Sequence, residues 1–134
     1  MITIKRIYAD PSEADGFRVL VDRLWPRGMT KEKAKVDLWL KEIAPATELR
    51  KWFGHDLKRW PDFVERYQKE LKTKSELLTV LADKARQGTV TLLFAGRDKD
   101  HNEAVVLYRL LTPHQDKIYR LKIEGFAVNT HEEV

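Results

Sequence analysis

Residues 17–28 read FRVLVDRLWPRG, an apolar run that passes directly into a cluster of charged residues with a proline and a glycine. The apolar side chains fall on both faces of a strand, with Phe17, Val19 and Val21 on one face and Leu20 and Leu24 on the other. A strand that is apolar on both faces is typical of the interior of a sheet in an α/β protein. The pattern therefore predicts a buried strand over residues 17–24, ended by Pro26 and Gly28.

Three further segments have strand patterns. Residues 89–95, TVTLLFA, are again apolar on both faces, and residues 2–8, ITIKRIY, predict a short strand. Residues 30–43 fit either a single helix or a helical turn followed by a strand. We favour the second interpretation, with the turn at 30–35 and the strand at 36–41.

The segments between these strands have helical spacing. They are a short helix capped by Thr47 and closed by Gly54, a helix begun by Pro61, a helix with a capping box of Thr73 and Glu76, and an apolar helix at 104–111. Alternation of strands and helices predicts a single α/β domain over residues 1–134, with a mainly parallel sheet flanked by helices.

The composition excludes several classes of function. The 134 residues, 43% of them hydrophobic and 34% charged, suffice for one core. The chain has no cysteine, which rules out disulfides, a thiolate nucleophile and cysteine-bound metal. The four histidines lack the spacing of a metal site, so we expect neither a metal nor a cofactor.

Location and charge narrow the choice of partners. No apolar run approaches the length of a membrane span, and MITIKRIY is not a signal peptide, so we expect a cytoplasmic protein without a membrane partner. The net charge is +4, and the lysines mostly alternate with acidic residues. This balance permits contact with phosphate without requiring nucleic acid.

The two buried strands both end in polar clusters. Residues 21–28 read VDRLWPRG, and residues 96–102 read GRDKDHN. Ligands of parallel sheets bind beyond the carboxyl ends of the strands, so neighbouring parallel strands would bring the two clusters into one crevice. We predict a binding site in that crevice.

The crevice would suit a small anionic ligand that bears phosphate or carboxylate. The residues expected to bind it are Asp22, Arg23, Arg27, Arg97, Asn102 and His55, with the arginines facing the anion and Asp22 orienting one of them. The unpaired amides at the start of the following helix would complete the cradle. Histidine gains and loses a proton near neutral pH, so His101, together with Asp98, is the candidate for acid–base catalysis.

Two structural interpretations compete with this site. Asp100 and Glu103 are spaced as a capping box, which would satisfy the same helix amides without a ligand. The charged residues of the first cluster would equally serve as an ion-pair network with Asp98.

A different class of function is a non-catalytic module that binds nucleic acid or protein. Residues 52–63, WFGHDLKRWPDF, mix aromatic and basic side chains, as surfaces that stack bases do. At helical spacing such aromatic residues more often anchor a core, and we favour that interpretation.

Four motifs carry a resemblance to a known family: GFRVLVDRLWPRG (16–28), DLWLKEIAPATELRKWFGHD (37–56), the Phe63–Tyr67 segment FVERY, and TLLFAGRDKDHNEAVVL (91–107). Together they resemble the YeaO-like family, a domain-of-unknown-function family of small bacterial proteins, over about residues 1–111. The resemblance implies a single α/β domain and implies no activity. Residues 112–134 extend beyond that core, and 117–128 alternate as an edge strand does, either packed on the sheet or paired with a partner chain.

A more distant branch of the wider family has a similar Asp-x-Arg-x-x-Pro signature after the first buried strand but carries a cysteine in the second loop. This chain has Arg97-Asp98 and His101-Asn102 in that loop. Any role of a thiol in that branch therefore does not transfer to this chain.

Overall fold

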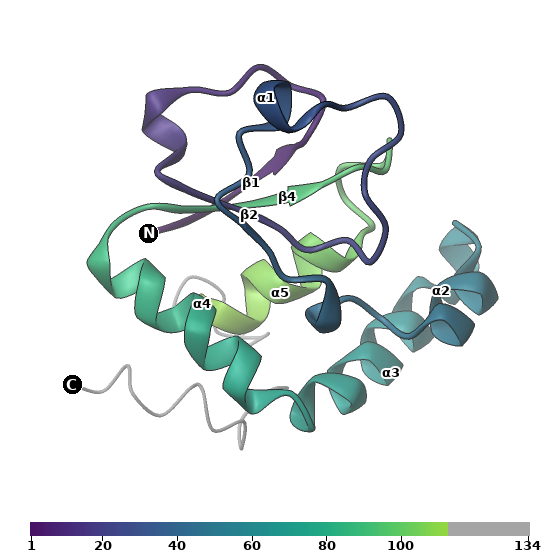
Figure 1. Ribbon diagram of the computed structural model, residues 1–134. Coiled ribbons are helices and arrows are strands. Elements are labelled where there is room, and N and C mark those ends of the chain that lie inside the picture. The colour runs from purple at the N-terminus through teal and green to yellow at the C-terminus, as the bar shows by residue number, and fades with distance from the viewer. Residues whose placement is uncertain (113–134) are drawn as a thin grey trace.

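The computed structural model describes residues 1–112 and contains a four-stranded parallel sheet with helices on both faces (Figure 1). The strands are β1 (Ile2–Arg6), β2 (Phe17–Leu20), β3 (Leu38–Trp39) and β4 (Val90–Phe94), in the spatial order β1-β4-β2-β3. The helices are α1 (Lys31–Ala34), α2 (Thr47–Phe53), α3 (Trp60–Lys72), α4 (Ser75–Gln87) and α5 (Glu103–Leu111), with short 3-10 turns η1 (Glu13–Asp15), η2 (Lys41–Ile43) and η3 (Leu57–Arg59). The predicted α/β architecture with a parallel sheet is confirmed. The predicted edge strand at 117–128 lies outside the described residues.

Strand β4 is the centre of the sheet. All five of its residues are buried, and it pairs in parallel with β1 on one side and with β2 on the other. The register places Val19 opposite Leu92 and Leu20 opposite Leu93. Because β2 and β4 are parallel neighbours, the polar segments that follow them leave the sheet at the same edge.

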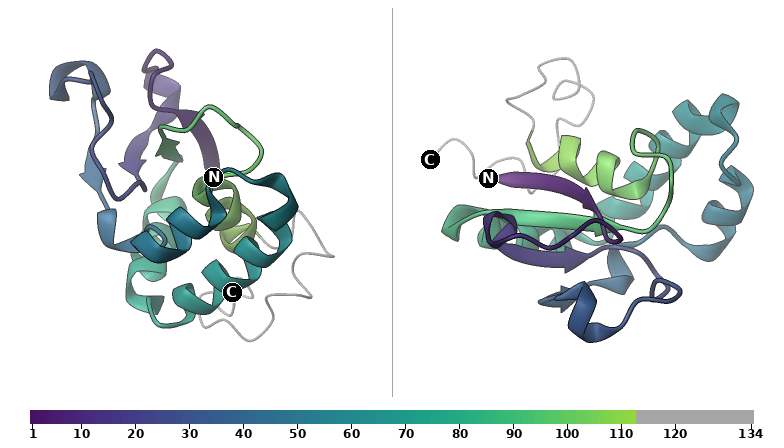
Figure 2. Two further views of the ribbon diagram at one scale, coloured as in Figure 1. Left: turned by 90° about the vertical axis from the view of Figure 1, so that its right-hand side faces the viewer. Right: turned by 90° about the horizontal axis from the view of Figure 1, so that it is seen from above.

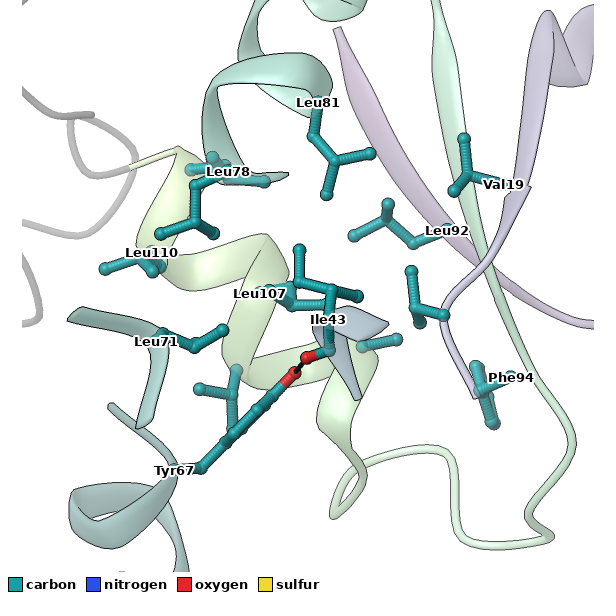
Figure 3. Packing of buried hydrophobic residues seen from close by; sticks show 14 of the residues in the cluster. Val19, Ile43, Tyr67, Leu71, Leu78, Leu81, Leu92, Phe94, Leu107 and Leu110 are labelled. Atoms are coloured by element: carbon teal, nitrogen blue, oxygen red, sulfur yellow. Dashed lines mark hydrogen bonds between the residues drawn. The ribbon is translucent and has the colours of Figure 1, made fainter. Parts of the chain in front are cut away.

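The two faces of the sheet bury unequal cores. Figure 2 shows α5 on one face and α1 on the other. The larger core joins Val19, Leu92 and Phe94 to the helices α2–α5, and Figure 3 shows these side chains packed together. The smaller core lies under α1 and is centred on Leu20 and Leu93. The alternation of faces along β2 and β4 therefore follows the two-residue period of the sequence.

The strand predicted over residues 17–24 is shorter than expected. It ends at Leu20, and Leu24 is 63% exposed rather than packed on the sheet. The reason is that a side chain takes over from the backbone: the Asp22 carboxylate accepts a hydrogen bond from the Ala95 amide at 2.9 Å. The strand therefore ends four residues earlier than the apolar pattern indicates.

The favoured interpretation of residues 30–43 is confirmed, although its strand is short. Helix α1 is capped by the Thr30 hydroxyl, which accepts from the Lys33 amide at 3.1 Å, and strand β3 follows. A helix over the whole segment is wrong because Lys35 adopts a left-handed backbone conformation that ends α1.

Two predicted helix caps are wrong. Thr47 is the first residue of α2, and the preceding Ala46 has no side-chain bond to the helix. The hydroxyl of Thr73 donates to the Glu70 carbonyl of α3, and the N-cap of α4 is Lys74, which makes no side-chain bond to the helix. The pattern of a capping box does not reveal that a preceding helix competes for the same hydroxyl.

A charged side chain lies inside the smaller core. Arg18 of β2 is 4% exposed and donates to the Ala34 carbonyl at 2.7 Å and to the Asp15 carboxylate at 2.6 Å. Burial of Asp15 opposes ionisation, yet hydrogen bonds from Lys5, from the Ser12 amide and from Arg18 lower its pKa below the usual value. The pair fastens the end of α1 and the η1 turn to the sheet.

A buried hydrogen bond of Tyr67 is expected to contribute measurably to stability. Its hydroxyl donates to the Ile43 carbonyl at 2.7 Å inside the larger core (Figure 3). The Tyr67→Phe variant leaves that carbonyl unpaired and should lower the free energy of unfolding by about 1–2 kcal/mol, measured by urea titration. Tyr8→Phe is the control, because the bond from Tyr8 to the Arg27 carbonyl is exposed. Equal losses for the two variants would contradict this prediction.

Candidate functional site

A cleft opens at the carboxyl ends of β2 and β4. Its inner hollow has a volume of about 420 Å³, and its walls come from the segments 22–27, 44–63 and 95–103. A second, more open hollow adjoins it and shares lining residues with it, among them Tyr8, Arg27 and His55. Helices α2 and α3 lie toward this end of the sheet (Figure 1). The crevice predicted from the two polar clusters therefore exists.

The structure brings every predicted site residue to this cleft. The inner hollow is lined by Asp22, Arg23, Arg27, His55, Asp98, His101 and Asn102, and the outer hollow by Arg97. Proximity alone does not assign the roles of these residues. Their hydrogen bonds separate the residues that hold the walls of the cleft from those that are open to a ligand.

Arg23 holds the wall of the cleft. Its guanidinium donates to the Ala44 carbonyl at 3.0 Å and to the Pro45 carbonyl at 3.3 Å, and it lies 3.7 Å from the Glu42 carboxylate. Its donors are thus directed at the backbone of the neighbouring segment, so its main role is to position that wall.

Asp22 also differs from its predicted role. Its carboxylate accepts from the Ala95 amide, and its backbone carbonyl accepts from the Trp39 indole at 2.8 Å. Within residues 1–112 it forms no ion pair with an arginine, and Asp98 pairs with His101 instead. The expected network of Asp22 and the arginines with Asp98 is therefore wrong, because Asp22 accepts from the Ala95 amide, Arg23 donates to backbone carbonyls and Asp98 pairs with His101.

Asp98 and His101 form a compact pair. The His101 Nδ1 lies 3.0 Å from Asp98 Oδ2, and the imidazole packs edge to face against Trp60 with 5.1 Å between ring centroids. The hydrogen bond from the Asp100 amide lowers the pKa of the Asp98 carboxyl. The hydrogen bonds and charge of His101 lower this pKa further, and slight desolvation of Asp98 opposes the shift. Asp98 thus stays ionised and fixes the ring through Nδ1, which leaves Nε2 as the nitrogen open to a ligand in the cleft.

The start of α5 is capped by a different residue from the one predicted. Asn102 Oδ1 accepts from the Val105 amide at 3.1 Å, and its amide group donates to the Asp98 carbonyl at 2.9 Å. The amides of Asp100 and His101 bond to the Asp98 carboxylate. The capping box of Asp100 and Glu103 is therefore wrong, and side chains already bond the Val105 amide of the helix and the Asp100 and His101 amides of the loop. Asn102 takes the cap because its backbone is extended immediately before the first helical residue.

Glu103 is a site residue that the sequence analysis missed. It lines the inner hollow and hydrogen-bonds to the Asp22 carboxyl from the first turn of α5. Burial is the main cause that raises the pKa of Glu103 well above its usual value. The hydrogen bond to Asp22 and the charge of Asp22 raise this pKa further, whereas the charge of Arg50 lowers it. Glu103 therefore keeps its proton to a higher pH than an ordinary glutamate does. Only the register of β2 on β4 brings the two carboxyl groups together, and no local pattern in the sequence signals the contact.

An aromatic wall faces these polar groups. Phe53 and Phe63 stack with 4.6 Å between ring centroids, and both line the inner hollow. Gly54 and His55 both have left-handed backbone conformations, which turn the chain sharply after α2 and leave the His55 ring near Phe53. The cleft thus combines an apolar wall with convergent polar groups, as small-molecule sites do.

Residues 1–112 include no group of three or more histidine, aspartate or glutamate side chains arranged to hold a metal ion. In the same part of the chain, none of the helices has the length and apolar character needed to cross a membrane.

The fold and the cleft define an α/β protein with a polar site at the carboxyl edge of a parallel sheet. A family model described as the inactive DUF488-N3 subclade, DUF488-N3i, matches residues 1–120, and the chain belongs to this family. Uncharacterized protein YeaO of Escherichia coli (strain K12) is 42% identical over 106 residues, which are 79% of this chain and 92% of that protein. Uncharacterized protein Rv3073c of Mycobacterium tuberculosis (strain ATCC 25618 / H37Rv) is 40% identical over 110 residues, 82% of this chain and 92% of its own length. No solved structure gives a significant match. The resemblance to the YeaO-like family is thus confirmed.

Glu103 is expected to make the folded protein less stable as the pH rises. Its pKa in the folded protein lies well above the ordinary 4.5, so above pH 4.5 the folded state keeps a proton that the unfolded chain has released. The resulting stabilisation is complete below pH 4.5 and is lost as the pH rises through the raised pKa, by up to about 1.4 kcal/mol per pH unit. Urea unfolding from pH 5 to 8 should show a flatter profile for Glu103→Gln than for the natural protein.

The exposed Glu65 of α3 provides a matched control for this measurement. Glu65→Gln should leave the pH profile of stability unchanged. If the Glu103→Gln profile runs parallel to that of the natural protein, the carboxyl pair does not hold the additional proton.

Proposed function

We propose that the protein binds a small anionic ligand, bearing phosphate or carboxylate, in this cleft. The observation that carries the proposal is the state of two arginines. Arg27 and Arg97 both line the outer hollow, and neither guanidinium has a hydrogen bond or ion pair to another side chain within residues 1–112. Arginines in this state are suited to grip an anion with charge-assisted hydrogen bonds.

The neighbouring cations support this distinction between structural and binding arginines. Arg6 also lines the outer hollow, but its Nε donates to the carbonyls of Ala95 and Gly96 at 3.2 and 2.9 Å. Like Arg23, it stabilises the loops and adds positive charge without being the primary contact. The ligand-binding role thus falls to Arg27 and Arg97.

Two observations bear on whether the ligand is also transformed. The family is described as an inactive subclade, which favours binding without turnover. The contact between His101 and Asp98 provides the parts of a general base, so acid–base chemistry is the second candidate function. Turnover of a bound ligand that is abolished by His101→Asn, with binding retained, would establish that second function.

A nucleic-acid module is less well supported by the aromatic segment. The guanidinium groups of Arg59 and Arg66 lie over the Trp52 ring, 5.2 and 4.1 Å from its centroid. Trp60 packs within the aromatic cluster, 5.5 Å from Phe63. These rings are already engaged by the protein's own side chains, which leaves less surface on which bases can stack.

Titration with anions tests the proposed function. Inorganic phosphate, sulfate and acetate at millimolar concentration should raise the melting temperature, and isothermal titration calorimetry should give a dissociation constant for at least one of them. Loss of one charge-assisted hydrogen bond costs about 1.5–3 kcal/mol, so Arg27→Ala and Arg97→Ala should each weaken binding by about tenfold or more.

Arg86→Ala is the matched control, because Arg86 is an exposed arginine of α4 that pairs with Asp83 and does not line the cleft. It should bind the anion as the natural protein does. The proposal is wrong if no anion binds, or if all three variants lose affinity equally.

A further inference from the structure

The cleft presents different polar groups at its two ends. The outer hollow is lined by Arg6, Arg27, Arg97 and Asp98. The inner hollow holds the neighbouring carboxyl groups of Asp22 and Glu103, together with Arg23, Arg50 and Asp98. Arg27 lines both hollows, so one ligand can contact both ends of the cleft. A ligand that fills both hollows therefore meets the guanidinium groups of Arg27 and Arg97 at one end and the carboxyl groups of Asp22 and Glu103 at the other.

The inner end is held in a fixed arrangement. The Ala95 amide donates to Asp22, and Glu103 is anchored in the first turn of α5 and bonded to Asp22. Burial and the neighbouring Asp22 favour the protonated form of Glu103, so the two adjacent carboxyl groups offer the cavity a hydrogen-bond donor and several acceptor sites. The charge of Arg50 of α2 acts on Glu103, and the charges of Glu103 and Asp22 act in turn on the Tyr67 hydroxyl of α3.

We propose that the natural ligand is a hydroxyl-bearing anion of the sugar phosphate class, with its phosphate at Arg27 and Arg97 and its hydroxyl groups at Asp22 and Glu103. This inference rests on the proposed function, because the anionic group supplies the first of the two contacts. It adds the chemical class of the rest of the ligand.

A hydroxyl group matches the inner end better than an ammonium group does. A hydroxyl both donates and accepts, so it pairs with a protonated and an ionised carboxyl group at once and displaces no proton. An ammonium group only donates, and it would face the positive charges of Arg50 and Arg23 in the same hollow. The stacked Phe53 and Phe63 add an apolar wall that suits the C–H face of a sugar ring.

A series of phosphate esters separates the two ends by calorimetry. The probes are ethyl phosphate, which has no hydroxyl group, 2-aminoethyl phosphate, and the sugar phosphates ribose 5-phosphate and glucose 6-phosphate. We expect at least one sugar phosphate to bind tenfold more tightly than ethyl phosphate. Glu103→Ala should remove this gain and leave the affinity for ethyl phosphate unchanged, whereas Arg27→Ala should weaken both kinds of ester.

Glu103→Gln provides a conservative variant, since its amide also donates and accepts, and it should keep the gain to within about threefold. Retained near-UV circular dichroism establishes that each variant is folded, and the comparison among esters on the natural protein needs no variant.

Each other outcome has a definite meaning. If ethyl phosphate binds and neither sugar phosphate binds more tightly, the inference is wrong and the proposed function stands. If 2-aminoethyl phosphate binds more tightly than the sugar phosphates, the inner end takes a cation and the inference is also wrong. If no ester binds, the proposed function itself fails, and the inference fails with it.

Discussion

The parallel pairing of β2 with β4 is the constraint on which the rest of the molecule depends. Strand β4 is buried along its whole length, so its register with β2 is fixed by packing on both faces. Both strands release polar loops at the same edge of the sheet. Beyond the strands, the hydrogen bond from the Ala95 amide to the Asp22 carboxylate continues the pairing of the two segments through a side chain. The candidate site begins at this hydrogen bond. The cleft is thus an extension of the sheet itself.

The wall of the cleft opposite that edge is fixed by side chains from several elements. The Ala44 carbonyl accepts from Arg23 and from the Lys74 amine, both at 3.0 Å, and the Ala46 amide donates to the Glu70 carboxylate at 2.9 Å. Burial lowers the pKa of Lys74, against the opposing charge of Glu70. Cations close to the backbone are therefore used for structure, and those available to a ligand lie farther out. For this reason, the number of arginines near the strand ends is larger than the number available to bind an anion.

The chain belongs to a subclade described as inactive, yet its cleft retains polar groups of the kinds that catalytic sites use. The chain has no cysteine, yet it keeps an Asp98 carboxylate in contact with His101, and Glu103, whose pKa is raised, next to Asp22. Both carboxyl groups are half-buried, and the Ala95 amide and their mutual contact offset part of the cost of removing them from water. A cleft arranged in this way is suited to recognise a polar ligand whether or not it transforms it.

The sequence by itself determined the α/β class, the buried strands and the edge at which the site lies. These follow from two-residue apolar periodicity and from the polar residues that end each strand, which are local properties of the chain. It did not foresee Arg18 inside the smaller core, because a buried guanidinium is tolerated only where backbone carbonyls and Asp15 converge on it. Nor did it distinguish Arg23 from Arg27, since partners from distant segments decide which of them is engaged. The tertiary structure alone decided that Asn102 caps α5 and that Glu103 faces Asp22, because several groups compete for each polar partner and only their placement in three dimensions selects one.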